Sequence, residues 1–283
     1  MPVAASKDEL RIDPAVPAGT GVLQIVRSGR RSVVSTAFAT SPLKLLTPRN
    51  HGSAAWIYTA NYGGGLVNGD ALHLTVDVAP DAAAFVSTQS ATKVYRSPHG
   101  TSARLDARVG PGGLLIVAPD PVMCFAGSTY RQTQHVDLAP DAGLVLLDWQ
   151  SSGRRAAGER WRFDRYSNRT TIRCDGRLMF FDGLELSVHD GDLAERLGRF
   201  ECLAVVAIAG PRLRGFAESI MGTVATEPVR RRADLLTSAS PLGDAGTVLR
   251  IAGTSVERVG HAIREHLRFV PELLGDDPWA RKW

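Results

Sequence analysis

The sequence predicts a mainly β protein: a layered or helical β-sheet of solenoid-like form, with a few short helices and one C-terminal helix. Residues 72–78 alternate apolar and polar side chains, the period of a strand with one buried face. A unit of strand, proline-led turn and apolar strand recurs around Pro80, Pro111 and Pro140, at intervals of about 30 residues. Such spacing indicates stacked hairpins, although unrelated hairpins would also be joined by turns of this kind.

Strand patterns fill the chain up to about residue 190. A first hairpin is expected to join residues 22–27 to 31–35 across Gly29, and Pro42 and Pro48 keep residues 41–48 extended. Asp175-Gly176 is the strongest hairpin signal, joining residues 170–173 to 178–181. The other strands are expected at residues 72–78, 114–118, 144–149 and 160–164.

Beyond residue 190 the pattern becomes mixed α+β. Short helices are expected at residues 192–200 and 214–222, with strands at 203–208 and 249–252. Ser255 is expected to cap a helix that runs to about residue 269. Its apolar face would dock on this chain's own sheet or on a partner, and it carries Val256, Val259, Ile263 and Leu267. We expect a flexible arm over residues 1–18 and a single domain over residues 19–283.

Composition excludes several classes of protein. The 283 residues are 44% hydrophobic and 22% charged, with a net charge of +4, which is ordinary for a soluble globular chain. No basic stripe with interleaved aromatic residues favours nucleic-acid binding. No signal peptide and no apolar run of about 20 residues is present, so we expect no membrane contact. The three well-separated cysteines indicate reduced thiols, hence a cytoplasmic protein.

The glycine-rich segment at residues 63–69 is not a nucleotide-binding loop. It leads into a strand, whereas a phosphate loop must open a helix so that backbone N–H groups face the anion. We therefore interpret it as a tight turn that excludes side chains, and expect a Gly64 substitution to harm folding for that reason. No nucleophile elbow and no metal-ligand spacing occurs, so we expect no catalytic residue, no metal site and no tightly bound cofactor.

Several charged residues allow two interpretations. Arg154 and Glu159 would form an ion pair that pins a loop, or Glu159 would face a polar cavity; Asp70, Lys93 and Asp148 carry a similar ambiguity. Charged groups inside a β-rich core need partners or water. A line of them would therefore mark a hydrated passage or a binding face.

Two motifs resemble the urease accessory protein D family, called H in some organisms. They are Gly64-Gly65-Leu66-Val67-Asn68-Gly69-Asp70 and Thr88-Gln89-Ser90-Ala91-Thr92-Lys93-Val94-Tyr95-Arg96. Pro119-Asp120-Pro121 and Gly153-Arg154 with Gly158-Glu159 also match, although Asp120 stands where the family usually carries Gln or Glu. The resemblance covers about residues 20–185, and the terminal residues 281–283 also fit.

The resemblance implies a β-rich fold and a non-enzymatic role. Proteins of this family bind apo-urease and recruit urease accessory protein F and the GTPase accessory protein G, so that nickel reaches the urease active site through a water-filled passage. The resemblance places Asp70, Ser90 and Glu159 along that passage, with nickel bound only transiently. It assigns structural or motif roles to Gly64, Gly65, Gly69, Thr88, Lys93, Tyr95, Arg96 and Arg154.

Two alternatives differ in class. The chain would serve as a scaffold for the maturation of another metalloenzyme. Or it would be a β-solenoid enzyme using Asp70, Lys93 and Glu159 as acid, electrostatic aid and base.

Overall fold

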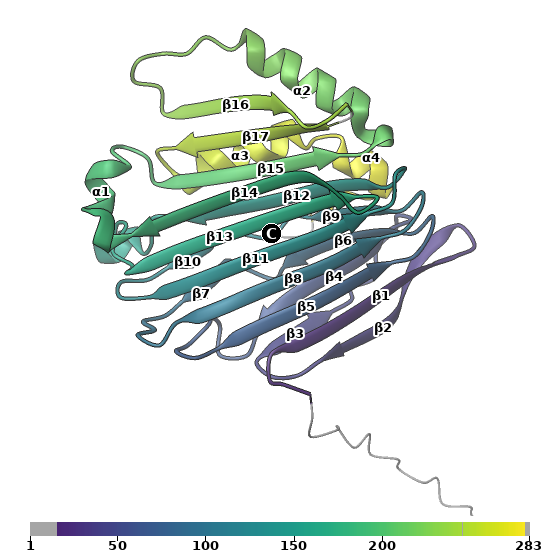
Figure 1. The fold of residues 1–283 in the computed structure, drawn as a ribbon, viewed down its shortest axis with the longest axis horizontal. Helices are drawn as coiled ribbons and strands as arrows, with labels where there is room; N and C mark the ends of the chain where they lie inside the picture. The colour runs from purple at the N-terminus through teal and green to yellow at the C-terminus, as the bar shows by residue number, and fades with distance from the viewer. Residues whose placement is uncertain (1–15, 245, 281–283) are drawn as a thin grey trace, which may run out of the picture.

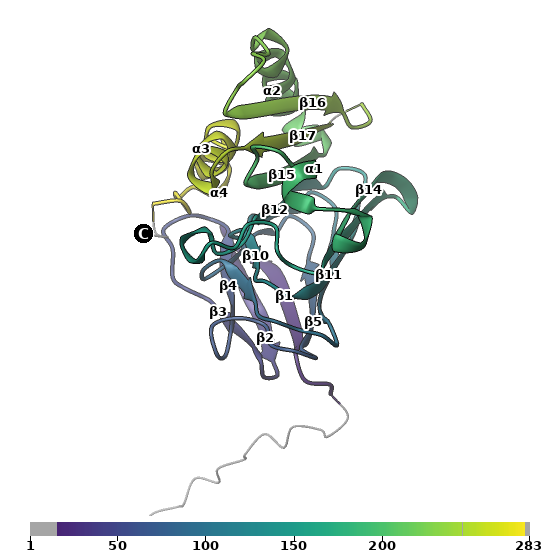
Figure 2. The same ribbon diagram turned by 90° about the vertical axis from the view of Figure 1, so that its left-hand side faces the viewer.

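Two β-sheets lie face to face, and helices cover the outer face of one of them (Figures 1 and 2). The computed structural model describes residues 16–244 and 246–280. Residues 1–15 of the predicted arm and the motif at residues 281–283 lie outside the described residues. The mainly β fold class, with few short helices and a C-terminal helix, is confirmed.

The first sheet has seven strands and forms the face nearest the viewer in Figure 1. In spatial order its strands are β14 (Arg177–Ser187), β13 (Arg165–Cys174), β11 (Thr129–Leu138), β8 (Thr101–Val109), β5 (Ala71–Val78), β1 (Thr20–Ser28) and β2 (Arg31–Ala39). Only the two outermost pairings, β1 with β2 and β13 with β14, are antiparallel.

The second sheet has ten strands. Its main path is β16 (Leu235–Pro241), β17 (Gly246–Gly253), β15 (Cys202–Ala209), β12 (Gly143–Ser151), β9 (Leu114–Val117), β6 (Ala83–Thr88), β4 (Ala55–Asn61) and β3 (Leu43–Leu46). Two short strands lie off this path, β7 (Thr92–Val94) and β10 (Val122–Cys124).

The 30-residue repeat corresponds to a physical stack. The first strand of each unit, β5, β8 and β11, pairs in parallel in the seven-stranded sheet, and the second strand, β6, β9 and β12, does so in the ten-stranded sheet. Register is kept across the turns: Val78 lies opposite Val109, which lies opposite Leu138. The predicted solenoid-like layering is therefore confirmed.

Both predicted hairpins are present, and their turns explain the residues found there. Asp175 and Gly176 both have positive φ angles, 51° and 71°, as a two-residue turn between twisted strands requires. Gly29 also has a positive φ, 57°, at the turn between β1 and β2.

The core lies in two main layers. One fills the space between the sheets, with Val76, Val109 and Val136 facing Leu144 and Leu146. The other fills the space between the ten-stranded sheet and the helices. Strand alternation explains why β12 contributes to both, because its successive side chains point to opposite faces.

The helices are α1 (Leu193–Arg196), α2 (Arg214–Thr226), α3 (Val256–His266) and α4 (Val270–Leu274). Short 3-10 turns occur at Arg155–Ala157, Val188–Asp190 and Pro211–Leu213. The Ser255 side chain caps α3 by accepting a hydrogen bond from Arg258 N. Val259, Ile263 and Leu267 are buried against the ten-stranded sheet, so the apolar face of α3 docks on this chain's own sheet.

Two sequence-based expectations about elements need correction, and one strand was not predicted. Residues 160–164 are not a strand: Trp161 has a φ of 53°, which a strand excludes, and its indole N–H bonds Phe200 O. The helix expected at residues 192–200 spans only Leu193–Arg196. Strand β16 was missed, because its sequence, Leu-Leu-Thr-Ser-Ala-Ser-Pro, lacks clear alternation.

Candidate functional site

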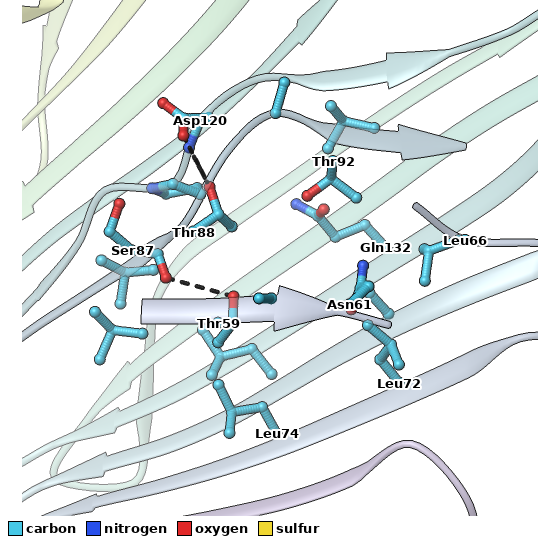
Figure 3. A pocket seen from close by; sticks show the side chains of 18 of the residues that line it. Thr59, Asn61, Leu66, Leu72, Leu74, Ser87, Thr88, Thr92, Asp120 and Gln132 are labelled. Carbon is cyan, nitrogen blue, oxygen red and sulfur yellow. Dashed lines mark hydrogen bonds between the residues drawn. The ribbon is translucent and has the colours of Figure 1, made fainter. Parts of the chain in front are cut away.

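A cavity of about 460 Å³ lies between the two sheets (Figure 3). Apolar residues such as Leu72 and Leu74 form one end of its wall. Polar side chains also line it, from β6, β7, β11, β12 and the segments that follow β6 and β9; these include Thr88, Ser90, Thr92, Asp120, Gln132, Gln134 and Asp148. Polar groups between two sheets are unusual, because facing sheets normally bury apolar side chains.

Asp148 is a half-buried carboxylate in the wall of this cavity. Alternation along β12 turns Leu144, Leu146 and Asp148 toward the seven-stranded sheet, while Leu147 and Trp149 face the helices. Its carboxylate accepts hydrogen bonds from Gln132 Nε2 at 2.6 Å and Asn168 Nδ2 at 2.5 Å. Burial raises the pKa of Asp148 to about 6, although these two hydrogen bonds oppose the rise.

The polar side chains around Asp148 form a belt between two apolar clusters. Gln132 lies opposite Asn168, and Gln134 opposite Thr170, all turned inward from β11 and β13. Gln134 Nε2 and Asn168 Oδ1 are buried and have no hydrogen-bond partner in the protein. Buried amide atoms without protein partners are usually satisfied by water, and Gln134 lines a cavity large enough to hold it.

The residues assigned to the passage by resemblance occupy three different places. Ser90 is exposed and lines the cavity between the sheets. Asp70 lines a separate cavity of about 350 Å³ beside His99 and Arg131, and its Oδ2 accepts Val67 N at 2.8 Å. Glu159 accepts a hydrogen bond from Ala126 N at 3.2 Å and pairs with Arg154, outside both cavity walls.

The ion pair between Arg154 and Glu159 is present, so the loop-pinning interpretation is the one observed. Arg154 Nε lies 3.0 Å from Glu159 Oε2, and the hydrogen bond from Arg154 holds the pKa of Glu159 below its usual value. The guanidinium also lies 4.3 Å above the Phe125 ring centroid. Arg154 therefore connects the loop after β12 to the loop after β10.

The second family motif, residues 88–96, forms the connection from β6 to β7 and includes β7 itself. Thr88 Oγ1 accepts a hydrogen bond from Asp120 N at 2.8 Å, and Tyr95 packs edge-to-face on Phe125 at 5.2 Å. Lys93 and Arg96 are exposed. Lys93 contributes through its backbone, because its carbonyl accepts Leu66 N from the glycine segment.

The glycine segment is a turn, but the steric restriction lies at Gly65 and not at Gly64. A Cβ on Gly65 would lie 2.7 Å from Lys93 O, whereas one on Gly64 would meet nothing within 4 Å. Gly64 and Gly69 are needed instead for their positive φ angles, 74° and 87°. The expectation that a Gly64 side chain would enter an occupied space is therefore wrong in its reason.

Sequence reasoning noted Asp148 but gave it no place in the passage. The available signal was a carboxylate inside the apolar run Leu144–Trp149, together with amides at inward positions of β11 and β13.

Among residues 16–244 and 246–280, no ion pair joins Lys93 to Asp70 or Glu159. In the same described residues, no group of three or more His, Cys, Asp or Glu could hold a metal ion. Nor does any described helix combine the length and apolar character needed to cross a bilayer.

Fold and site together define a class: a two-layer, solenoid-like β scaffold with a cavity and a half-buried carboxylate between its sheets. The sequence profile described as UreD urease accessory protein matches residues 18–283. The chain belongs to this family.

Individual relatives agree over nearly the whole chain. A urease accessory protein UreD from Sorangium cellulosum (strain So ce56) is 52% identical over 266 residues, which cover 94% of this chain and 85% of that protein. UreD from Anaeromyxobacter sp. (strain Fw109-5) is 42% identical over 96% of this chain and 92% of its own length. Urease accessory protein D from Arabidopsis thaliana is 32% identical over 92% of this chain and 99% of its own length.

Proposed function

We propose that this chain is a cytoplasmic urease maturation chaperone. It binds apo-urease and, with urease accessory protein F and the GTPase accessory protein G, is required for nickel insertion into the urease active site. Membership of the UreD family supports the role in urease maturation, as do the names of relatives that match along most of this chain. The free cysteines Cys124, Cys174 and Cys202 are consistent with a reducing compartment.

The observation that carries the nickel step is the half-buried carboxylate of Asp148, which lines the cavity between the sheets. Ni²⁺ accepts oxygen and nitrogen ligands, and one carboxylate with two amides is a weak, incomplete ligand set. Such a site stabilises a passing cation without holding it. The cation replaces part of the favourable solvation that Asp148 lost on burial, so its charge becomes less costly when the ion is near.

Asp70, Ser90 and Glu159 remain in this proposal as residues beside the route. Ser90 contributes a hydroxyl to the cavity wall. Asp70→Asn separates the charge of Asp70 from its hydrogen bond to Val67 N, because the amide keeps an oxygen acceptor for Val67 N but removes the charge. Loss of nickel delivery in Asp70→Asn, with an unchanged melting temperature, would support a place on the route. Full delivery would assign Asp70 to the turn alone.

The deciding experiment uses Asp148→Asn, which keeps the side-chain shape and removes the charge. The full-length variant is expressed with urease and the other accessory proteins in nickel-limited cells, and nickel per urease active site is measured. We expect a loss of about tenfold in the rate of activation, equivalent to about 1.4 kcal/mol in the barrier. Copurification of the variant with apo-urease should be unchanged.

The matched control is Asp137→Asn, which removes an exposed carboxylate from the outer face of β11. It should activate urease normally. Normal nickel content with Asp148→Asn, or with the whole chain deleted, would overturn the proposal.

A further inference from the structure

The turn between α2 and β16 carries consecutive exposed arginines. In Figures 1 and 2, α2 and β16 lie at the end of the molecule opposite to β1 and β2, and residues 227–234 join them. Arg230, Arg231 and Arg232 are all exposed, and Val229 just before them is 86% exposed. Like charges next to one another repel, so this run is unfavourable unless opposite charges lie near it.

The backbone of this turn is fixed in place. Ala233 N donates to Arg230 O at 3.1 Å, which closes a four-residue turn with two of the arginines at its centre. Arg199 Nε donates to Ala233 O at 2.9 Å, and Thr254 N donates to Asp234 O at 2.9 Å. The turn is thus tied to the segment before β15 and to the segment after β17, and its arginines are presented from an ordered backbone.

The acids nearby do not neutralise these charges. We call residues 227–234, together with Arg199 and Arg258, the basic turn; it holds five arginines and two carboxylates. One of those carboxylates, Asp234, already pairs with Arg258 at 3.4 Å. Within residues 16–244 and 246–280, the arginines at 230–232 form no ion pair. Because the whole chain has a net charge of only +4, most of that charge is concentrated here.

We propose that the basic turn is a docking surface for an acidic surface of another protein, with Val229 as its apolar contact. This goes beyond the proposed function, because it states the chemistry that one partner must present and says nothing of how nickel moves. Protein interfaces combine apolar contacts with a polar rim, and arginine is enriched in them because its planar guanidinium pairs with carboxylates in bidentate geometry. A turn that is already ordered also costs less to bind.

A nucleic acid fits the same charges less well. Single strands bind where bases stack on open aromatic rings, and residues 227–234 contain no aromatic side chain. The nearby ring of Phe200 is covered, because the guanidinium of Arg199 lies 4.5 Å from its centroid. The exposed side chain of Val229 has no counterpart in a phosphate backbone. Charge with an apolar contact and without a stacking surface therefore favours a protein partner.

The test separates the charges of the basic turn from its apolar contact. One variant combines Arg230→Ser, Arg231→Ser and Arg232→Ser, which keeps the backbone hydrogen bond to residue 230; the other is Val229→Ser. Each purified full-length chain, once its melting temperature is shown to be unchanged, is offered separately to apo-urease, accessory protein F and accessory protein G. Association and dissociation rate constants are measured by surface plasmon resonance at low and high salt.

We expect one of these proteins to respond to both variants. The triple variant should associate with it about tenfold more slowly at about 0.05 M salt, and this difference should disappear near about 0.5 M because salt screens exposed charges. Val229→Ser should instead speed dissociation about fivefold at both salt concentrations, since an apolar contact is not screened.

The matched control combines Arg108→Ser, Arg169→Ser and Arg173→Ser, which remove the same charge from exposed positions on β8 and β13. It should associate at the native rate; an equal slowing would assign the effect to net charge and overturn the proposal. Unchanged rates with all three proteins would overturn it too, as would loss of binding only to an RNA oligonucleotide. If the docking surface fails while Asp148→Asn still blocks nickel insertion, the proposed function stands.

Discussion

At the scale of single residues, the chain keeps a carboxylate where a hydrophobic side chain would be more stable. Asp148 is half-buried between two sheets, accepts hydrogen bonds from the amides of Gln132 and Asn168, and forms no ion pair within the described part of the chain. Burying such a group weakens the fold in its charged form. A residue that lowers stability at neutral pH is best explained by what it does there.

The first prediction concerns Asp148 and pH. Its pKa is about 6 in the folded chain, against an ordinary value of 3.8, so the folded state holds the proton to higher pH. This contribution to stability is complete below about pH 4 and is lost as pH rises through 6. Asp148→Asn should therefore exceed the native chain in stability at pH 7, by up to about 3 kcal/mol, and match it near pH 4.

Urea denaturation of both proteins across pH 4–7 measures this difference. A difference that does not change with pH would mean that the Asp148 carboxyl titrates alike in the folded and unfolded chains.

The second prediction separates two neighbouring glycines. Gly65→Ala places a methyl group 2.7 Å from Lys93 O and from Tyr95 Cε2, so the backbone must move and about 3 kcal/mol should be lost. Gly64→Ala meets no atom and strains only its positive φ, which costs about 1–2 kcal/mol. Thermal melts of the two variants should rank Gly65→Ala as the less stable; the opposite order would contradict the steric argument.

At the scale of elements, α3 shows how a surface that looks available is already occupied. Its apolar residues contact β15 and β17, so they stabilise this chain and are not free for a partner. The exposed side of α3 carries Glu257, His261 and Arg264, and Glu257 and Arg264 also line a cavity beneath the helix.

The third prediction tests that assignment. Ile263→Ala removes a side chain that is 3% exposed and should lower the free energy of unfolding by about 2–4 kcal/mol. His261→Ala, on the exposed side of the same helix, should change it by less than about 0.5 kcal/mol. If Ile263→Ala instead left stability unchanged and weakened copurification with urease, its side chain would belong to a partner interface.

At the scale of the whole molecule, the β-rich part and the C-terminal α+β part share one sheet. β12 pairs with β9 on one side and with β15 on the other, and alternate residues of both β12 and β15 enter both main core layers. No separate core exists on which either part of the described chain could fold alone. We therefore keep the prediction of a single domain over residues 19–283.

The fourth prediction follows from that shared sheet. Scanning calorimetry of the full chain should show one transition, with calorimetric and van't Hoff enthalpies in agreement. Two resolved transitions would indicate that the part after residue 190 unfolds by itself.

Much of the fold was predictable from the sequence because its signals are local. Alternation at residues 72–78, the Asp175-Gly176 turn and the Ser255 cap each act within a few residues, and each element was found. The prediction of a strand at residues 160–164 was wrong because Trp161 packs its indole into an aromatic cluster and adopts a positive φ, which no short-range pattern reveals.

By itself the sequence determined the solenoid-like layering, the hairpins and the resemblance to a family, since periodicity and motif spacing are properties of the chain alone. Only the tertiary structure decided which charges meet. Asp148 reaches Gln132 and Asn168 because β11 and β13 pair in register in one sheet while β12 lies in the sheet that faces them. A cavity is a space left between elements, so its lining depends on how the sheets pack against each other.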